Sequence, residues 1–485
     1  MTSWRPPDPT DSRKLEPEAV FEAGLENHHV STTAYPIAHE KTWRPYRVAR
    51  ERVPAVAASA FRELDEIGLY FHIPFCETRC SFCEYTVTSR SEHSGVDAYM
   101  DALENELALW ESAIDLGTKT IAGLDIGGGT PSFVPAERIE RLVALTRGRL
   151  RFGEGADVSI ETTPAIAAAE PDKIRAYRRA GIDRISMGIQ VIEPDLLRVL
   201  NREANGASSH RRAVENIRAA GFDRLNVDLM YGFKDQSLES WRATLAWAIG
   251  LGPEYVTLYR MRYKLTRISH QAPFVTLDAV RPMERLAKAM LADAGYRATP
   301  GKTTFSRIPG DVGTSSYLAR RVVEGLPYLG LGLGAQSLTH TTIAYNDGAA
   351  AKALPPYIKS VSSGRLPIQD LYDLPAVQIM GKMCSVSFYF GEIHLGAFER
   401  KFGLPLEEAY PEAVAFVLRE GLMELTDETL RLTARGCEHK NGVHALFYAP
   451  SIQEYLLERD PDEAKDFERH RRSAARVAGE ELLHV

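Results

Sequence analysis

Short apolar runs alternate with amphipathic stretches over much of the chain, from about residue 68 to residue 300. The apolar runs, each long enough for one buried strand, are 68–73, 119–126, 157–162, 183–189, 224–229 and 254–259. The amphipathic stretches between them include 96–114, 136–146, 171–180, 209–220 and 237–249. A strand followed by a helix, repeated in this way, is typical of parallel strands joined by right-handed crossovers. The pattern therefore predicts an α/β fold, with chemical groups gathered at the carboxyl ends of the strands.

The two flanks differ from this central part. Residues 1–60 are Pro-rich at the start and show little periodicity, so we expect an arm. Residues 457–485 are dense in charge and are expected to form a solvated helix or tail. Between them, the C-terminal third predicts a hairpin over 421–433 and helices over 376–388, 406–420 and 436–447.

Composition and charge narrow the function classes. The 485 residues are 44% hydrophobic and 25% charged, which is ordinary for a globular chain. A net charge of −7 argues against a general nucleic-acid binder. No apolar run is long enough to span a membrane, and the start has no signal-peptide core. We expect a cytoplasmic protein that binds neither nucleic acid nor membrane. Cys384 and Cys437 are isolated and are interpreted as buried or incidental thiols.

The other three cysteines, Cys76, Cys80 and Cys83, lie just after the first predicted strand with the spacing C-x3-C-x2-C. A disulfide with one odd thiol is disfavoured, because nothing else in the sequence indicates an oxidising compartment. A zinc site needs a fourth ligand, for which His72 is a candidate, although on a strand it is expected to pack beside the loop. A [4Fe–4S] cluster held by three thiolates is favoured, since it leaves one iron open to a small molecule.

This stretch resembles a known family. C-x3-C-x2-C after a strand is the signature of radical S-adenosylmethionine (SAM) enzymes. The longer string Tyr70-x-His-Ile-Pro-Phe-Cys76 resembles the branch typified by the oxygen-independent coproporphyrinogen III dehydrogenase, the HemN-like proteins. The resemblance implies that SAM binds the open iron of the cluster and is cleaved to methionine and a 5′-deoxyadenosyl radical. It also implies a partial (β/α)6 barrel with a C-terminal helical, winged-helix-like domain.

Several further motifs follow in the order of that family. The GGGTP segment at 127–131 resembles the turn that lines SAM, which implies that Gly128, Gly129 and Thr130 bind it. Glycines there let the backbone approach a ligand closely and expose amide donors. The other residues that the resemblance assigns to the SAM site are Glu161, Gln190, Arg202 and Asp228, with Tyr70 as a neighbour.

Two of these interpretations depend on local context. Asp228 lies deep in an apolar strand and needs a partner, which a bound adenosine or a basic side chain would supply. The alternating glycines of 327–337 are similar to the family region that helps hold a second SAM, with Gln336 and Ser337 as candidates.

Pattern and resemblance together give a domain plan. It comprises an N-terminal arm or lid (1–64), the radical SAM barrel (65–300), a barrel extension with the second-ligand region (301–370), a HemN-like C-terminal domain (371–450) and a charged tail (451–485).

The particular reaction depends on one departure from the family. The founding dehydrogenase carries a further Cys two residues after the last cluster cysteine, where this chain has Tyr85. The branches with an aromatic residue there include methyltransferases, cyclopropanases and haem-processing proteins. We therefore expect an enzyme that uses two SAM molecules and transfers a methylene group to an sp2 carbon, with Tyr85 beside the reacting groups. The alternatives are oxidative decarboxylation of coproporphyrinogen III and a haem-binding protein.

The expected partners follow from this chemistry. They are a small aromatic or heteroaromatic substrate, an external electron donor of the flavodoxin or ferredoxin type and, for methylation, a partner methyltransferase. Four cations lie within 260–267, a loop that could meet an anionic substrate, although a solvated loop is the commoner explanation. No general base is identified, with Glu84 and His340 as guesses. A monomer is expected.

Overall fold

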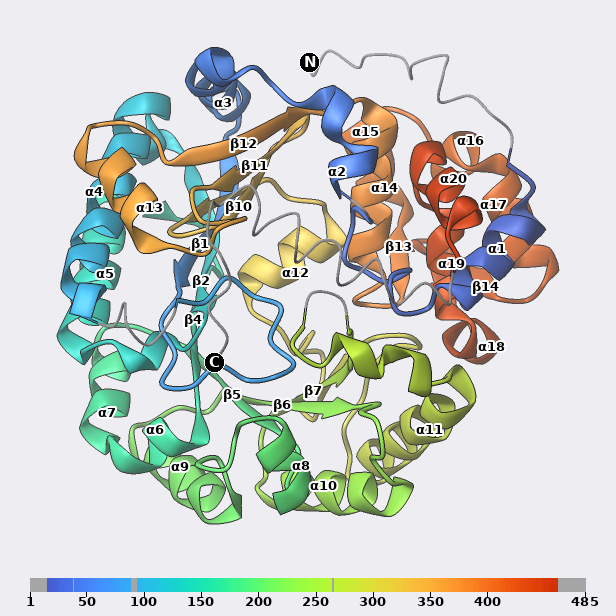
Figure 1. The fold of residues 1–485 in the computed structure, drawn as a ribbon, viewed down its shortest axis with the longest axis horizontal. Helices are drawn as coiled ribbons and strands as arrows, with labels where there is room; N and C mark the ends of the chain where they lie inside the picture. The colour runs from blue at the N-terminus through green and yellow to red at the C-terminus, as the bar shows by residue number, and fades with distance from the viewer. Residues whose placement is uncertain (1–14, 38, 89–93, 264–265, 461–485) are drawn as a thin grey trace.

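A computed structural model describes residues 15–37, 39–88, 94–263 and 266–460. Strands occupy the middle of the molecule, and helices α4 to α11 form an outer ring around one side of them (Figure 1). A group of helices from the C-terminal third lies beside this ring, together with the N-terminal helix α1. The molecule therefore has a barrel unit and a C-terminal unit.

Six parallel strands form the barrel, as the sequence predicts. They are β1 (Glu66–Ile73), β2 (Thr120–Gly128), β4 (Val158–Thr162), β5 (Arg184–Gln190), β6 (Leu225–Tyr231) and β7 (Tyr255–Arg260). They pair side by side in this order. The sheet continues beyond both ends through β8 (Thr304–Ser306), β9 (Tyr328–Leu331), β10 (Gln336–Leu338), β11 (Thr342–Asn346) and β12 (Ile368–Asp373), and the short β3 (Arg151–Phe152) pairs with β2. Of these, β9 pairs parallel with β1, and β8 pairs antiparallel with β7.

The helices around the barrel bury one apolar stripe each. Along α4, Tyr99, Leu103, Leu107 and Trp110 recur every three or four residues and are at most 1% exposed. The ring consists of α4 (Val96–Ile114), α5 (Ala136–Arg149), α6 (Pro164–Ala169), α7 (Pro171–Arg179), α8 (Pro194–Val199), α9 (Ala207–Ala219), α10 (Leu238–Gly250) and α11 (Leu277–Asp293). The five helices predicted from periodicity are among them, with ends shifted by at most three residues.

Polar side chains close the floor of the barrel. Ser315 donates a hydrogen bond to Asp125 over 2.9 Å, and the backbone N–H of Ser316 donates to Asp157 over 2.8 Å. Arg184 Nη2 reaches the carbonyl of Gly313 at 2.7 Å. These bonds hold the loop that precedes α12 (Ser316–Val323) under the strands. The barrel is thereby sealed at one end, and the carboxyl ends of the strands remain for a ligand.

The N-terminal segment packs into the C-terminal unit. Phe21 of α1 (Pro17–Glu26) lies 5.5 Å from Phe416, ring centre to ring centre. Tyr35 and Trp43 both donate to the side-chain oxygen of Gln378, over 2.6 and 3.0 Å. Trp43 is fully buried. Phe21, Tyr35 and Trp43 of the expected arm therefore share a core with the C-terminal unit, whereas Val53 and Phe61 are buried in the barrel core. The helices of this segment are α1, α2 (His39–Thr42) and α3 (Val53–Arg62).

The C-terminal unit differs from the sequence prediction at three places. The predicted helix over 406–420 is two helices that break at Pro411, which cannot continue a helix because it lacks an N–H. The predicted helix over 436–447 is also divided, at His439. The expected tail begins with a packed helix whose Ile452 and Leu456 are at most 1% exposed, and residues 461–485 lie outside the described part.

The predicted hairpin is present and belongs to a three-stranded sheet. The elements of the unit are α14 (Ala376–Ser387), β13 (Glu392–His394), α15 (Leu395–Phe402), α16 (Leu406–Ala409), α17 (Pro411–Arg419), β14 (Met423–Leu425), β15 (Thr429–Leu432), α18 (Ala434–Glu438), α19 (Lys440–Leu446) and α20 (Pro450–Glu458). The helix before them, α13 (Leu354–Ser362), packs on α4 and is part of the barrel core. Within the described residues, no helix is long and apolar enough to cross a membrane.

Candidate active site

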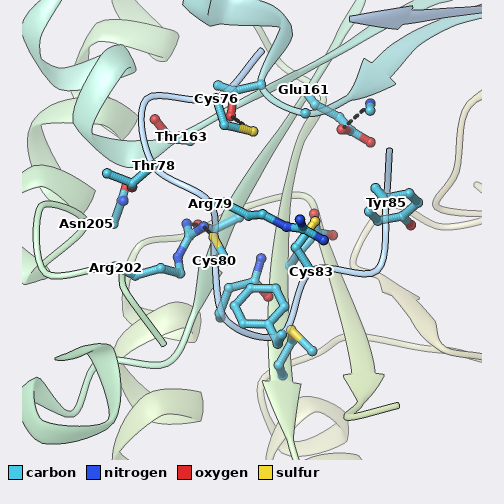
Figure 2. Close-up of a pocket in the computed structure, with 18 of the residues that line it drawn as sticks. Cys76, Thr78, Arg79, Cys80, Cys83, Tyr85, Glu161, Thr163, Arg202 and Asn205 are labelled. Atoms are coloured by element: carbon cyan, nitrogen blue, oxygen red, sulfur yellow. Dashed lines mark hydrogen bonds between the residues drawn. The ribbon is translucent and has the colours of Figure 1, made fainter. Parts of the chain in front are cut away.

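A cavity of about 220 Å³ opens at the carboxyl ends of the barrel strands. The residues selected from the sequence that line it are Cys76, Cys80, Cys83, Tyr85, Gly128, Gly129, Thr130, Glu161, Gln190, Arg202 and Asp228. Figure 2 shows the three thiols on one loop, with Arg202 on the side of Cys80. The fold thus brings together residues that are up to 152 positions apart, from Cys76 to Asp228.

The cysteine loop is held on both sides. The backbone N–H of Ser81 donates to the carbonyl of Leu200 over 3.1 Å, and that of Arg267 donates to Ser81 over 3.1 Å. Inside the cavity, Arg202 Nη1 lies 3.2 Å from Cys80 Sγ and Thr130 Oγ1 lies 3.6 Å from Cys76 Sγ. Burial raises the pKa of the Cys76 thiol to about 12. A metal that binds it must therefore displace the thiol proton, which thiophilic metals do readily.

His72 is not placed as a fourth ligand. Its Nε2 lies 2.6 Å from the carbonyl of Thr86, and its Nδ1 lies 3.3 Å from the hydroxyl of Tyr70. Burial lowers the pKa of this imidazole to about 4, so the ring is neutral at physiological pH. Both nitrogens are engaged within the protein, in agreement with the expectation that His72 packs beside the cysteine loop.

Close packing within the protein explains the glycine turn after β2, in addition to the expected approach of a ligand. Gly128 has φ +116°, and a Cβ on it would meet the imidazole of His72 at 2.6 Å. The expectation of free amide donors is wrong. The N–H of Gly128 donates to Glu161 Oε2 over 3.3 Å, that of Gly129 donates to Ile73 O over 2.8 Å, and that of Thr130 donates to Phe75 O over 2.7 Å. These bonds fix the cysteine loop against β2.

Two carboxylates, Glu161 and Asp228, face the cavity from β4 and β6. Burial raises the pKa of Glu161 to about 8, and the negative charge of Asp228 adds to this effect. Burial also raises the pKa of Asp228 to about 6. The partners of Asp228 are Asn226 Nδ2 at 2.7 Å and Ser186 Oγ at 3.3 Å, which are neither the basic side chain nor the ligand expected from the sequence. A cationic ligand would stabilise both carboxylates.

Gln190 and Arg202 complete this side of the cavity. Gln190 has φ +68°, and its buried side-chain oxygen has no hydrogen-bond partner among the described residues. A Cβ on Gly188 would meet the Gln190 amide nitrogen at 2.6 Å, so a larger residue there would displace this amide. Arg202 Nη2 donates to the carbonyl of Gly188 over 2.5 Å. A strained residue with an unsatisfied acceptor is typical of a ligand site.

Two candidates do not line the cavity. Tyr70 lies on β1 and bonds His72, and its ring stacks on Tyr317 with the centres 6.3 Å apart. Gln336 donates to the hydroxyl of Tyr345 over 2.9 Å and accepts from the hydroxyl of Tyr328. Both ends of its amide are therefore bound within the protein. His340, one of the guessed bases, also lies outside the lining.

The mouth of the cavity contains tyrosines and arginines. Tyr85 and Tyr259 are 56% and 39% exposed, yet burial raises the pKa of each phenol. Both rings line the cavity, so part of their exposed surface lies within it. Arg262 forms an ion pair with Glu84, the other guessed base. Arg260 Nη2 bonds the carbonyl of His28 over 2.5 Å.

Two cations of the expected basic loop thus have defined partners. Lys264 lies outside the described residues.

Tyr389 is a residue that the sequence does not single out, and its phenol interacts electrostatically with Tyr85, Tyr259 and Arg262. No local motif marks this residue, because it follows α14, more than 100 positions after β7, the last parallel strand of the barrel.

Three thiols at the carboxyl ends of the strands of a parallel βα barrel, in one cavity with two carboxylates, define the fold and site of a radical SAM protein. Comparison with known proteins agrees. Residues 70–248 match the radical SAM superfamily, and residues 390–438 match the HemN C-terminal domain.

Relatives narrow the family further. The chain is 32% identical to the oxygen-independent coproporphyrinogen III oxidase of Cereibacter sphaeroides over 64% of this chain and 70% of that protein. It is 29% identical to the heme chaperone HemW of Escherichia coli, over 59% and 72%. The structure of coproporphyrinogen III oxidase (HemN) from E. coli, described as a radical SAM enzyme, superposes with a TM-score of 0.69 at 24% identity, covering 85% of this chain and 96% of that one.

The chain belongs to the radical SAM superfamily, in the family of the oxygen-independent coproporphyrinogen III oxidases and their relatives. Radical SAM enzymes use a [4Fe–4S] cluster and SAM. The residues present fit both groups. Three thiols share one cavity, and the two carboxylates and Arg202 match the positive and negative groups of SAM.

Proposed function

We propose that this protein is a radical SAM oxidoreductase that decarboxylates propionate side chains of a coproporphyrinogen-type substrate. Oxidative decarboxylation is one of the alternatives that the sequence leaves open, and the named relatives support it better than methylene transfer. The observation that carries the proposal is the cavity itself. Its lining brings the thiol loop and the two carboxylates together with Tyr85, Tyr259 and Arg262. The last three residues offer aromatic faces and a cation to a flat, anionic substrate.

The roles of the residues follow from their positions. Cys76, Cys80 and Cys83 would hold the cluster. Glu161 and Asp228 would face the ammonium and sulfonium groups of SAM, and Arg202 its carboxylate. When bound, the cluster and SAM supply a 5′-deoxyadenosyl radical. The chain would orient the substrate within reach of it and exclude water.

The proposed reaction removes a hydrogen atom, CO2 and one electron from a propionate side chain. One hydrogen atom leaves the β-carbon of a propionate, the C–C bond to its carboxylate breaks to release CO2, and a vinyl group remains. One electron passes to a one-electron acceptor. An external flavodoxin- or ferredoxin-type protein is proposed as the electron donor for SAM cleavage, and the enzyme is proposed to act as a monomer.

A second candidate is methylene transfer, which Tyr85 favours. This aromatic residue stands where the founding dehydrogenase carries a cysteine. Its side chain lines the cavity, and the residue is 56% exposed. In this reaction a hydrogen atom is taken from the methyl group of a second SAM, and the resulting methylene radical adds to an sp2 carbon of an aromatic substrate. S-adenosylhomocysteine leaves, giving a methyl group or a cyclopropane. A partner methyltransferase belongs to this candidate alone.

One anaerobic experiment separates the candidates. Reconstituted protein is incubated with dithionite, SAM and coproporphyrinogen III, and products are followed by mass spectrometry. The proposal predicts 5′-deoxyadenosine, CO2 and a product with one or two vinyl groups. S-adenosylhomocysteine, with deuterium from methyl-labelled SAM in 5′-deoxyadenosine, would support methylene transfer instead. Tight haem binding with no product from SAM would overturn both and favour a haem-binding protein.

A further inference from the structure

Glu84 and Arg262 form an ion pair within the lining of the cavity. Glu84 belongs to the thiol loop, between Cys83 and Tyr85, and Arg262 follows the end of β7 by two residues. The two side chains are 24% and 26% exposed, so the pair is accessible to a molecule that enters the cavity. A carboxylate of that molecule would compete with Glu84 for the same guanidinium.

The backbone is held on both sides of this ion pair. The N–H of Met261 donates to the carbonyl of Tyr231 over 2.8 Å. Nζ of Lys352 donates to the carbonyl of Tyr85 over 3.0 Å. The ion pair itself joins only the ends of two side chains. Because side-chain rotamers change far more easily than a fixed backbone, the pair can open without movement of either loop.

Arg260, two residues before Arg262, also lines the cavity but is held differently. Its Nη2 donates to the carbonyl of His28 over 2.5 Å, and its Nη1 donates to the side-chain oxygen of Asn441 over 3.0 Å. These partners are uncharged and belong to the N-terminal segment and to α19. Arg260 therefore joins three parts of the chain, whereas Arg262 has an anionic partner that another anion can replace.

Exchange of one carboxylate for another costs little at this place. A partly exposed ion pair contributes about 1 kcal/mol or less to stability. The guanidinium presents parallel N–H groups to either carboxylate, so its charge-assisted hydrogen bonds are kept. The released Glu84 side chain, already 24% exposed, gains contacts with water. Glu84 thus compensates the charge of Arg262 in the free protein without closing this position to an anionic ligand.

We infer that Arg262 binds one carboxylate group of the substrate, and that Glu84 occupies this position until the substrate displaces it. The inference rests on the proposed function and names the residue that selects a carboxylate-bearing substrate. Tyr85 and Tyr259 in the same lining offer ring faces to the body of that substrate. A neutral ring system would gain these aromatic contacts but would bring no partner for the guanidinium. The exchange therefore favours anionic over neutral ligands.

A purely structural ion pair between the two loops is the competing explanation. In that case loss of either member loosens the cavity, and both variants bind ligands more weakly. Exchange predicts opposite signs, because removal of Glu84 takes away a competitor and removal of Arg262 takes away the binding group. Arg320 and Glu66 provide a matched control, since they form an ion pair of 2.6 Å that is 34% and 32% exposed and lies outside the cavity lining.

The test measures binding to anaerobically reconstituted full-length protein with saturating SAM. The probes are coproporphyrin III, a stable porphyrin with four carboxylates, benzene-1,3-dicarboxylate and the neutral benzene-1,3-dicarboxamide. Arg262→Met is expected to raise the Kd of both carboxylate probes about tenfold or more, the effect of one charge-assisted hydrogen bond. Glu84→Gln is expected to lower the same Kd values about two- to fivefold, the effect of a partly exposed ion pair. The Kd of the dicarboxamide should change less than about twofold in either variant, since this probe carries no charge.

A double variant completes the comparison. When Glu84→Gln is combined with Arg262→Met, the tighter binding should vanish, because no guanidinium remains to compete for. This variant leaves no unpaired carboxylate, so it carries the test if Arg262→Met does not fold. Glu66→Gln and Arg320→Met should each change the Kd values less than about twofold. Iron content is measured in every variant, because Glu84 adjoins Cys83.

The outcomes separate this inference from the proposed function. Higher Kd values in both Arg262→Met and Glu84→Gln, or unchanged values in both, would overturn the exchange, whatever the substrate is. Opposite shifts for the dicarboxylate, with no binding of coproporphyrin III to the wild type, would support the exchange and contradict the proposed substrate. A fall in the SAM bound per protein in Arg262→Met, measured by equilibrium dialysis, would assign the carboxylate to SAM and overturn the substrate site.

Discussion

Arg202 donates from Nη1 to the sulfur of Cys80 over 3.2 Å, while its Nη2 donates to the carbonyl of Gly188. One guanidinium thus joins the thiol loop to strand β5. Arg202 is 7% exposed, so little water screens its charge from the sulfur. A fixed cation at this position stabilises a thiolate, and it favours the more negative, reduced state of a cluster bound there.

Replacing Arg202 should therefore lower the reduction potential of the reconstituted cluster. Arg202→Met removes the positive charge, so we expect a fall on the order of tens of mV, since about 59 mV corresponds to a tenfold change for one electron. A potential titration followed by electron paramagnetic resonance measures it. Arg198→Met is the control, because Arg198 is exposed on α8 and pairs with Asp195. Equal potentials for both variants and the wild type would contradict this role.

Binding of SAM should depend on pH through Glu161. Its pKa of about 8, raised chiefly by burial, means that the free protein carries a protonated carboxyl at neutral pH. A cationic ligand favours the carboxylate, so affinity should rise as pH increases from 6.5 to 9, by at most tenfold per unit below the pKa, with release of a proton.

Calorimetry in two buffers of different ionisation enthalpy measures that proton. Glu161→Gln should bind SAM more weakly and lose most of the pH dependence, whereas Glu203→Gln, at an exposed position in the same half of the barrel, should keep it. Asp228, whose pKa is raised to about 6, adds a smaller dependence at the acid end. A pH-independent affinity in the wild type would count against the assignment of Glu161.

The barrel could be predicted because its signals are local. Each strand is an apolar run, and each helix repeats its apolar stripe over several turns, so that element ends fall within a few residues of the prediction. The thiols and Glu161 come from a strand end or the loop after a strand, where a parallel barrel concentrates its ligands, whereas Asp228 lies within β6 and Arg202 follows α8.

The cavity mouth could not be predicted in the same way. The Arg262–Glu84 ion pair in the cavity lining joins residues 178 positions apart, and no sequence motif marks it. The surroundings of Gln336 could not be predicted for a related reason. Its amide bonds Tyr328 and Tyr345 across a turn between antiparallel strands, and pairing of this kind is not visible in one sequence. Packing of the N-terminal aromatic residues into the C-terminal unit likewise depends on contacts between the chain's two ends.

Gly128 should tolerate no side chain. Gly128→Ala places a methyl group 2.6 Å from the His72 ring at a backbone φ of +116°, so we expect both strain and a displaced thiol loop. The expected loss is about 2–4 kcal/mol of folding free energy, together with a lower iron content after reconstitution.

Gly155→Ala is the matched control, because φ there is +71° with open space around the new methyl group. It should lose only about 1 kcal/mol and keep its iron. If both variants reconstitute equally well, the tight approach of His72 to the turn does not support the loop.

The three thiols should be required together, and the two isolated ones should not. Cys76→Ala, Cys80→Ala and Cys83→Ala should each abolish both cluster assembly and cleavage of SAM to 5′-deoxyadenosine, because a cluster with fewer than three thiolates would be poorly held. Cys384→Ala removes a fully buried thiol far from the cavity lining. It should cost about 1 kcal/mol of stability through the small void, yet retain cleavage.

Iron content, absorbance near the cluster bands and the yield of 5′-deoxyadenosine report these effects separately. Retained cleavage in any of the three loop variants would exclude a three-thiolate cluster as the source of the chemistry, whereas loss of cleavage in Cys384→Ala at full iron content would reveal a functional thiol outside the cavity.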